Sequence, residues 1–153
     1  MISQTSLGEH IKDYSFFFYN PEEALHLSQR EKAKAAECIC NIEEELRHAI
    51  DCHSQILISR YIELLLDHCN RFYERQFITR CEANKKIMKK TDVLLKDYIL
   101  SGKLKYNTSP SLGYCAKILQ LSSHYFNDLL KFESGKNIDE YFESKRLEMA
   151  KSM

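Results

Sequence analysis

The fold is decided by the stretch Tyr114-Cys-Ala-Lys-Ile-Leu-Gln-Leu-Ser-Ser-His-Tyr-Phe-Asn-Asp-Leu-Leu-Lys-Phe-Glu-Ser-Gly135. Its pattern predicts two helices joined by a tight turn at Gln120-Leu121. Ala116 is small where a crossing helix must come close, Ser122 suits the N-cap of the second helix, and Gly135 is a natural helix stop. This order is typical of the helix-turn-helix motif, whose second helix can enter a DNA groove.

The periodicity of the same stretch assigns an inner and an outer face to each helix. One side of the first helix carries Leu112, Cys115, Ala116 and Leu119. We expect the second helix to run over Ser122–Glu133 with Tyr125, Phe126, Leu129 and Leu130 directed inward. Its outer face then carries five polar residues: Ser123, His124, Asn127, Asp128 and Lys131.

Helix start signals are also present on both sides of the motif. Pro110 suits the first turn of the first helix, and Asn137-Ile-Asp-Glu140 is a capping box that opens a final helix through Tyr141 and Phe142 to the end. The polar loop Ser101–Pro110 is the best candidate for a domain boundary.

Three longer helices are predicted upstream. Ser28-Gln-Arg-Glu31 is a capping box for a helix to about His48, with an apolar stripe that includes Ile39, Ile42 and Leu46. A second helix, N-capped by Asp51, runs to about Thr79, and a third spans Glu82–Leu100 with Ile87, Val93, Leu94, Tyr98 and Ile99 apolar. The first two form an antiparallel hairpin whose wide stripes predict self-association.

Residues 1–27 leave two alternatives open. Tyr14-Ser-Phe-Phe-Phe-Tyr19 is aromatic and strand-like, and Asn20-Pro21 breaks it. The segment is either the last strand of a domain outside this sequence or an aromatic plug against the following helices. For its aromatic side chains we favour core packing over an effector pocket.

Composition narrows the class of protein. The 153 residues are 44% hydrophobic with only four Gly and two Pro, which favours packed helices. Net charge is zero, but residues 1–70 carry 12 acids and 6 bases, whereas residues 71–153 carry 10 acids and 16 bases. A basic half is a hint of nucleic-acid contact, although solvated helix faces explain it equally well.

Other chemistry has little support in the sequence. The six cysteines include no Cys-x-x-Cys pair, and neither a signal peptide nor an apolar run of membrane-spanning length is visible, so we expect a reducing, cytoplasmic setting. His48 and Cys52 have helical metal-ligand spacing, but no second pair completes a set, so we predict no metal and no cofactor. A Gly-rich phosphate loop, a Gly-x-Ser-x-Gly elbow and a His-Glu-x-x-His motif are all missing, so we predict that the chain is not an enzyme.

A set of residues in and after the motif forms a recognisable pattern: Tyr114-Cys115-Ala116, Leu119-x-Leu121-Ser122, Tyr125-Phe126, Leu129-x-Lys131, Glu133-Ser134-Gly135-Lys136, Glu140-Tyr141 and Ala150-Lys151. This pattern resembles the AraC-type (AraC/XylS) family of bacterial transcription regulators. Leu65–Arg80 also resembles the connecting helix of family members from Bacteroides-like bacteria, so the resemblance covers nearly the whole chain and is weakest over residues 1–27.

The resemblance implies parts that this sequence does not contain. Family members usually have an N-terminal sensor domain, often a small β-barrel, and two helix-turn-helix units joined by a long helix. This sequence begins at what resembles the helical tail of the sensor part and ends within the joining helix, so it is truncated relative to the family. A small-molecule effector is therefore expected only through the sensor domain.

The family's binding mode implies DNA contacts on the second helix, Ser122–Glu133, in a major groove. Asn127 can pair with an adenine edge, and His124 can donate to a guanine or a phosphate. Ser123 can bond a phosphate near the helix N-terminus, while Lys131 and Lys136 neutralise phosphates. Asp128 opposes this role unless it accepts from a cytosine amine or pairs with a lysine. One unit alone predicts weak binding, on the order of 10⁻⁴–10⁻⁶ M.

Together these observations predict an all-α protein with a long helical hairpin, a connecting helix and a homeodomain-like three-helix helix-turn-helix unit. We divide it into residues 1–27 (sensor tail or aromatic segment), 28–80 (homodimerising helical pair), 81–109 (connecting helix and linker) and 110–153 (first helix-turn-helix unit and start of the joining helix). The alternative function is a helical dimerisation or interaction protein that does not read DNA.

Overall fold

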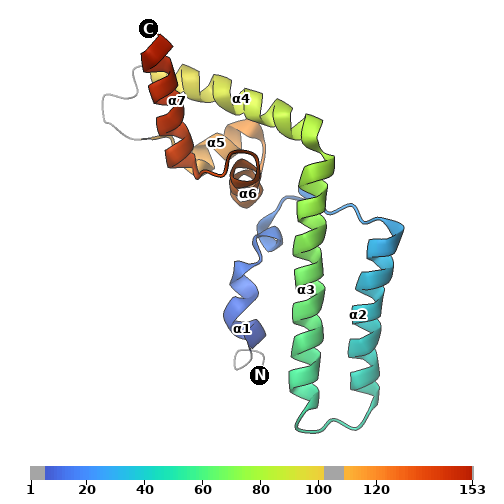
Figure 1. Cartoon of the computed structure of the whole chain (residues 1–153). Helices are drawn as coiled ribbons and strands as arrows, with labels where there is room; N and C mark the ends of the chain where they lie inside the picture. Colours follow the sequence, from blue (N-terminus) through green and yellow to red (C-terminus); the bar gives the residue numbers. More distant parts are fainter. Residues whose placement is uncertain (1–5, 102–108, 153) are drawn as a thin grey trace. The chain divides into compact units, whose positions relative to one another are not determined.

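The structure, a computed structural model, describes residues 6–101 and 109–152, and this part of the chain is helical without any strand (Figure 1). The all-α prediction is confirmed. The strand alternative for Tyr14–Tyr19 is wrong, because short 3-10 turns occupy Ile11–Asp13, Ser15–Phe18 and Pro21–Glu23. The helices are α1 (Ser6–His10), α2 (Gln29–Arg47), α3 (Ser54–Thr79), α4 (Cys81–Leu100), α5 (Leu112–Leu119), α6 (Ser123–Ser134) and α7 (Ile138–Ser152).

Contacts divide the chain into two compact units, which differ from the four segments predicted from the sequence. The first unit contains the described residues up to Phe17 together with Leu25–Gln76, and the second contains Phe18–Ala24 and the described residues from Phe77 onward. Most of the predicted boundary loop, residues 102–108, lies outside the described residues. The short segment Phe18–Ala24 thus belongs to the unit that contains the helix-turn-helix motif, although it lies far from it in sequence.

Local capping signals explain where the helices of the first unit begin. Ser28 accepts from the Glu31 amide while Glu31 accepts from the Ser28 amide, so the predicted capping box of α2 is confirmed. Asp51 accepts from the amides of His53 and Ser54, as expected of a residue at a helix start, and α3 begins at Ser54, close to the start predicted near Asp51. Helices α2 and α3 run side by side in opposite directions, as expected of a hairpin (Figure 1).

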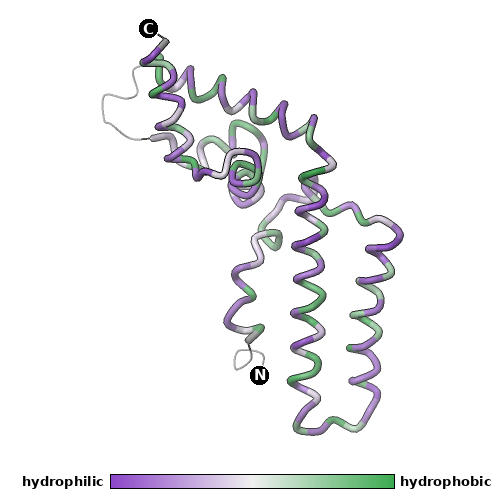
Figure 2. Tube along the Cα trace, viewed as in Figure 1, coloured by the Kyte–Doolittle hydropathy of each residue, from purple (hydrophilic) through white to green (hydrophobic). Residues whose placement is uncertain are grey.

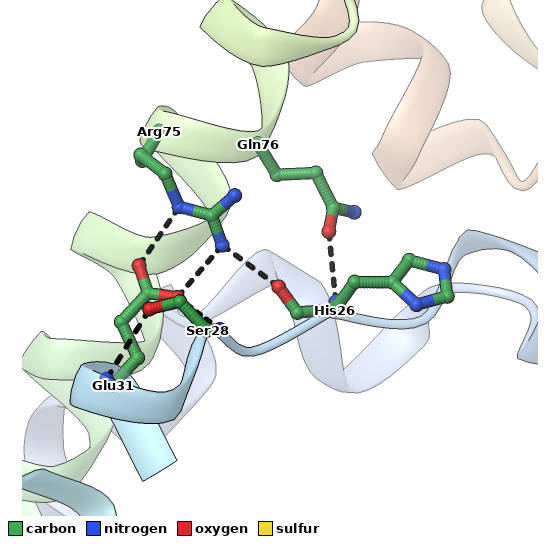
Figure 3. A network of polar contacts seen from close by, with 5 residues as sticks. All are labelled: His26, Ser28, Glu31, Arg75 and Gln76. Carbon is green, nitrogen blue, oxygen red and sulfur yellow. Dashed lines mark hydrogen bonds and ion pairs between the residues drawn. The ribbon is translucent and has the colours of Figure 1, made fainter. Parts of the chain in front are cut away.

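A polar network ties the start of α2 to the end of α3 (Figure 3). The Arg75 guanidinium donates to both carboxylate oxygens of Glu31, at 2.8 and 2.9 Å, and to the carbonyl oxygen of His26 at 2.7 Å. The amide of His26 donates to the side-chain oxygen of Gln76 at 2.8 Å. Burial acts to raise the pKa of Glu31, but the donors from Arg75 and Ser28 outweigh it and lower the pKa. The network fixes the register of the hairpin.

The aromatic residues from Tyr14 to Phe17 belong to the first unit, and Tyr14 and Phe16 pack against its helices as in the plug alternative. Tyr14 is buried with Leu7 and Leu66, and its hydroxyl donates to Asp67 at 2.9 Å. Burial, followed by this hydrogen bond to a carboxylate, raises the pKa of Tyr14 to about 12. Phe16 stacks on Tyr73 with ring centroids 5.5 Å apart. Tyr14 and Phe16 therefore contribute to the packing of the first unit, whereas Phe17 stays 53% exposed.

The apolar stripe of α2 is only partly used within this chain. Hydrophobic residues recur along α2 and α3 (Figure 2), but in α2 Cys38 alone is buried. The large apolar side chains of the hairpin that remain exposed are Ile39, Leu46, Ile50, Ile56, Leu57, Leu64 and Ile78.

The second unit packs α4, α5, α6 and α7 around one core. Its centre is formed by Leu95, Cys115, Ala116, Phe126, Leu130 and Phe142. Tyr141 of α7 donates to Asp92 of α4 at 2.8 Å, and Lys145 forms an ion pair with the same carboxylate at 3.4 Å. Helix α4, predicted as a connecting helix, therefore belongs to the helix-turn-helix core.

The predicted inner face of α4 was wrong in one respect. Val93 is 58% exposed, whereas Leu95, which the periodicity did not select, is fully buried. Thr91 and Asn84 are also buried; Thr91 donates to the Ile87 carbonyl, and Asn84 donates to the Phe77 carbonyl and to Glu133. Because polar residues with internal partners occupy inward positions, an apolar pattern alone could not locate the face.

Within residues 6–101 and 109–152, none of the helices has the length and apolar composition needed to cross a membrane.

Candidate nucleic-acid interface

A left-handed turn sets the angle between α5 and α6. Gln120 has φ 59°, and the Leu121 amide donates to the Ala116 carbonyl at 2.9 Å. Ala116 is 1% exposed, so the small side chain predicted at the helix crossing is buried there. The predicted turn at Gln120-Leu121 is confirmed. Pro110, predicted in the first turn, instead precedes the helix, because Ser111 is the N-cap of α5 and its side chain accepts from the Tyr114 amide.

Both ends of α6 are capped as the sequence predicted. The Ser122 hydroxyl accepts from the Tyr125 amide at 3.2 Å, and Gly135 ends the helix with φ 69°. Tyr125, Phe126, Leu129 and Leu130 are all buried, as expected. These four anchors fix the rotation of α6 and hence which side chains form its outer face.

The outer face of α6 consists of two neighbouring rows of side chains, since residues four apart share a side of a helix. We name Ser123, Asn127 and Lys131 the open row. Lys131 is exposed, and Ser123 and Asn127 are half-buried. The second row contains His124, which is exposed, and Asp128, which is half-buried. Four of the five predicted DNA-contacting residues thus lie on one helix face.

The fifth predicted residue, Lys136, lies beyond the end of α6. Its amide donates to the Ser134 hydroxyl, and its ammonium donates to the Ser144 hydroxyl of α7 at 2.6 Å. Lys136 is exposed, so a phosphate contact requires only exchange of the serine partner.

The segment Phe18–Ala24, which the sequence did not assign to this site, packs on the second row. Phe18 stacks on the His124 ring with centroids 4.6 Å apart. The Tyr19 hydroxyl donates to Asp128 at 2.7 Å, and its ring meets Tyr125 edge-on at 5.2 Å. Within the chain Asp128 therefore accepts from the Tyr19 hydroxyl and, at 3.5 Å, from the side-chain amide of Asn127, and neither partner is the lysine that was one of its two predicted partners.

The same segment places a carboxylate at the N-terminus of α6. Glu23 is only 4% exposed and accepts from the Ser122 amide at 2.7 Å, the Ser122 hydroxyl at 2.5 Å and the Asn20 amide at 2.7 Å. A helix N-terminus carries partial positive charge and unpaired amides, so it stabilises an anion. Sequence reasoning missed this contact because Glu23 and Ser122 are 99 positions apart.

Within residues 6–101 and 109–152, no group of three or more His, Cys, Asp or Glu side chains is placed to hold a metal ion. Cys115, next to the small crossing residue Ala116, is fully buried, and burial raises the pKa of its thiol to about 11. A thiol held protonated in this way is a packing residue rather than a nucleophile.

Comparisons of this chain with protein-family models, with curated proteins and with solved structures give no match.

Proposed function

We propose that the second unit reads double-stranded DNA, with α6 as the recognition helix and the open row facing the bases and phosphates. The observation that carries this proposal is the left-handed turn at Gln120 over the buried Ala116, which holds α6 across α5 with its polar row outward. The resemblance of the motif to AraC-type regulators supports the same function. The proposal includes transcription regulation in a bacterial cytoplasm.

Each residue of the interface has a definite role in this proposal. Asn127 pairs with an adenine edge, and His124 donates to a guanine or a phosphate once its ring is accessible. Ser123 bonds a phosphate near the helix N-terminus, and Lys131 and Lys136 contribute salt-dependent affinity without sequence information. With one such unit, the expected dissociation constant is on the order of 10⁻⁴–10⁻⁶ M at physiological salt.

A fluorescence-anisotropy titration of a labelled duplex at several salt concentrations tests this proposal. Lys131→Ala is expected to weaken binding and to reduce the salt slope by about 1, the effect of one lost phosphate contact. Asn127→Ala is expected to relax sequence preference. Lys32→Ala, which removes the same charge from an exposed position of α2 in the first unit, is the matched control. Binding that tolerates His124→Ala, Asn127→Ala and Lys131→Ala alike contradicts the proposal.

A second candidate function, self-association without DNA reading, is favoured by the exposed apolar residues of α2 and α3. We infer that two copies pair through residues 28–80, because large apolar side chains such as Leu46 and Leu64 are exposed on the hairpin. Sedimentation equilibrium measures this directly. Leu46→Lys is expected to shift the chain toward monomer, whereas Leu147→Lys, at an equally exposed position of α7, is not. A wild-type chain that is monomeric throughout contradicts pairing.

A further inference from the structure

The segment Phe18–Ala24 covers one side of the proposed recognition helix. Two contacts lie on the second row: the stacking of Phe18 on His124 and the hydrogen bond from Tyr19 to Asp128. A third lies at the N-terminus of α6, where Glu23 binds Ser122. These three contacts involve the second row and the helix N-terminus, and the open row is linked to them only through the hydrogen bond from Asn127 to Asp128.

Glu23 takes the place of an external anion at this N-terminus. Burial of a carboxylate is costly unless hydrogen bonds and favourable charge compensate for it. Here the Asn20 amide, the Ser122 amide and the Ser122 hydroxyl donate to the carboxylate, and the positive end of α6 stabilises its charge. The two Ser122 donors and the helix end are groups that can bind a phosphate at a helix N-terminus. While Glu23 is bound, the Ser122 amide and hydroxyl are unavailable to a DNA phosphate, and a negative charge lies beside the path of the backbone.

The width of the major groove makes the coverage incompatible with docking. The groove is about 12 Å wide, and a helix with its side chains is already about 10–12 Å across. The Phe18 ring adds a further layer on His124, with its centroid 4.6 Å from that of the imidazole. Phe18 is 54% exposed, so its outer surface would meet the groove wall first.

We propose that Phe18–Ala24 is an autoinhibitory plug that must leave α6 before the helix enters a major groove. The inference rests on the proposed DNA-binding function and adds its regulation. Only molecules in which the plug has left α6 can bind DNA, and they are a small fraction of the population. The apparent dissociation constant for DNA therefore equals the intrinsic constant divided by that fraction. A change that weakens the plug tightens DNA binding without adding any contact to DNA.

Glu23→Gln is the first test, with Glu22→Gln as the matched control. A glutamine at position 23 loses the charge and presents an NH₂ group where the carboxylate accepts from three donors. Glu22 is the exposed neighbour in the same 3-10 turn, so its substitution changes net charge equally and leaves the plug contacts intact. Duplex affinity is expected to rise about tenfold for Glu23→Gln and less than about twofold for Glu22→Gln.

Phe18→Ala is a second test that does not depend on the buried carboxylate. Phe18 and Phe17 are 54% and 53% exposed, so neither alanine substitution is expected to unfold the chain. Only Phe18 contacts His124, whereas Phe17 contacts Tyr14 and Phe16. Phe18→Ala should therefore tighten DNA binding several-fold, and Phe17→Ala should leave it unchanged.

Hydrogen exchange provides a readout without DNA. In Glu23→Gln the Ser122 amide should exchange faster, while the Phe126 amide, which donates to the Ser122 carbonyl within α6, should stay protected.

The outcomes separate the plug from the proposed function. Equal affinity of wild type, Glu23→Gln and Phe18→Ala for DNA overturns the plug and leaves DNA binding standing. An equal gain for Glu23→Gln and Glu22→Gln also overturns it, because the effect is then one of net charge. If neither the wild type nor any variant binds a duplex at low salt, the DNA-binding function fails, and the plug with it.

Discussion

Replacing Gly113 and Gly135 separately with alanine adds the same methyl group in two backbone conformations, and the structure predicts opposite effects on stability. Gly135 has φ 69°, and a Cβ at this position meets nothing within 4 Å. The cost is therefore conformational rather than steric. A left-handed conformation destabilises the folded state by about 1–2 kcal/mol for a non-glycine residue. Alanine also reduces the conformational entropy of the unfolded chain, which offsets about 0.4–1 kcal/mol of this loss. Gly135→Ala should thus lower the free energy of unfolding by about 1 kcal/mol.

Gly113 lies within α5, where alanine is the better helix former. A Cβ at this position lies 3.7 Å from the Ser123 hydroxyl oxygen, which is an ordinary van der Waals contact. Alanine stabilises a helix interior by about 0.5–1 kcal/mol relative to glycine, and position 113 is near the helix start. We expect Gly113→Ala to raise the free energy of unfolding by about 0.5 kcal/mol.

Urea denaturation followed by far-UV circular dichroism, together with native-state hydrogen exchange of the α6 amides, measures the two changes. The exchange data are needed because they report on the second unit alone. The two variants should differ by about 1.5 kcal/mol, which corresponds to about 6 °C or more in the thermal midpoint of a unit of this size. A change of the same sign in both variants would refute the assigned conformations of the α6 C-cap and of α5.

Three further predictions concern packing, pH and thiol reactivity. Leu130 is fully buried, so Leu130→Ala should lower the free energy of unfolding in urea by about 2–5 kcal/mol. Leu147 is 57% exposed, so Leu147→Ala should change that free energy by less than about 0.5 kcal/mol. The pKa of Tyr14 is raised from 10.0 to about 12 in the fold, so its stabilising contribution is complete below pH 10 and is lost as the pH rises from 10 to about 12. In this range the free energy of unfolding should fall by up to about 1.4 kcal/mol per pH unit. Tyr14→Phe should flatten this slope. Mass-spectrometric mapping of alkylation in the native state should find slow labelling at Cys38 and Cys115, which are buried, and fast labelling at the exposed thiols of Cys40, Cys52 and Cys81.

The parts of the fold that the sequence predicted correctly depend on neighbouring residues. The capping box at Ser28 and Glu31, the cap at Ser122 and the stop at Gly135 are all local hydrogen-bonding or conformational preferences. The inner face of α6 followed from helical periodicity, because its four inward residues are apolar without exception. Where inward residues are polar, as in α4, the same reasoning failed at Val93 and Leu95.

The part of the candidate site that the sequence did not predict depends on contacts between distant residues. The aromatic run from Tyr14 to Tyr19 signalled packing, but its pattern did not indicate that Phe18 and Tyr19 pack on α6 while Phe16 packs in the other unit. The sequence around Glu23 does not indicate that it binds Ser122. A glutamate three positions after Asn20 is already explained by the capping box that these two residues form. The most direct sequence indication was Asp128, whose charge does not suit a DNA-facing position and which binds Tyr19 in the fold.

The central claim, that the outer face of α6 contacts DNA, is tested most directly by mapping amide chemical-shift changes in ¹⁵N-labelled protein during titration with a short duplex. We predict the largest changes at Ser122, Ser123, Asn127 and Lys131, with smaller changes along α2 and along α3 up to Gln76. Changes confined to α2 and α3, or no change at duplex concentrations well above the expected dissociation constant, on the order of 10⁻⁴–10⁻⁶ M, would contradict the account.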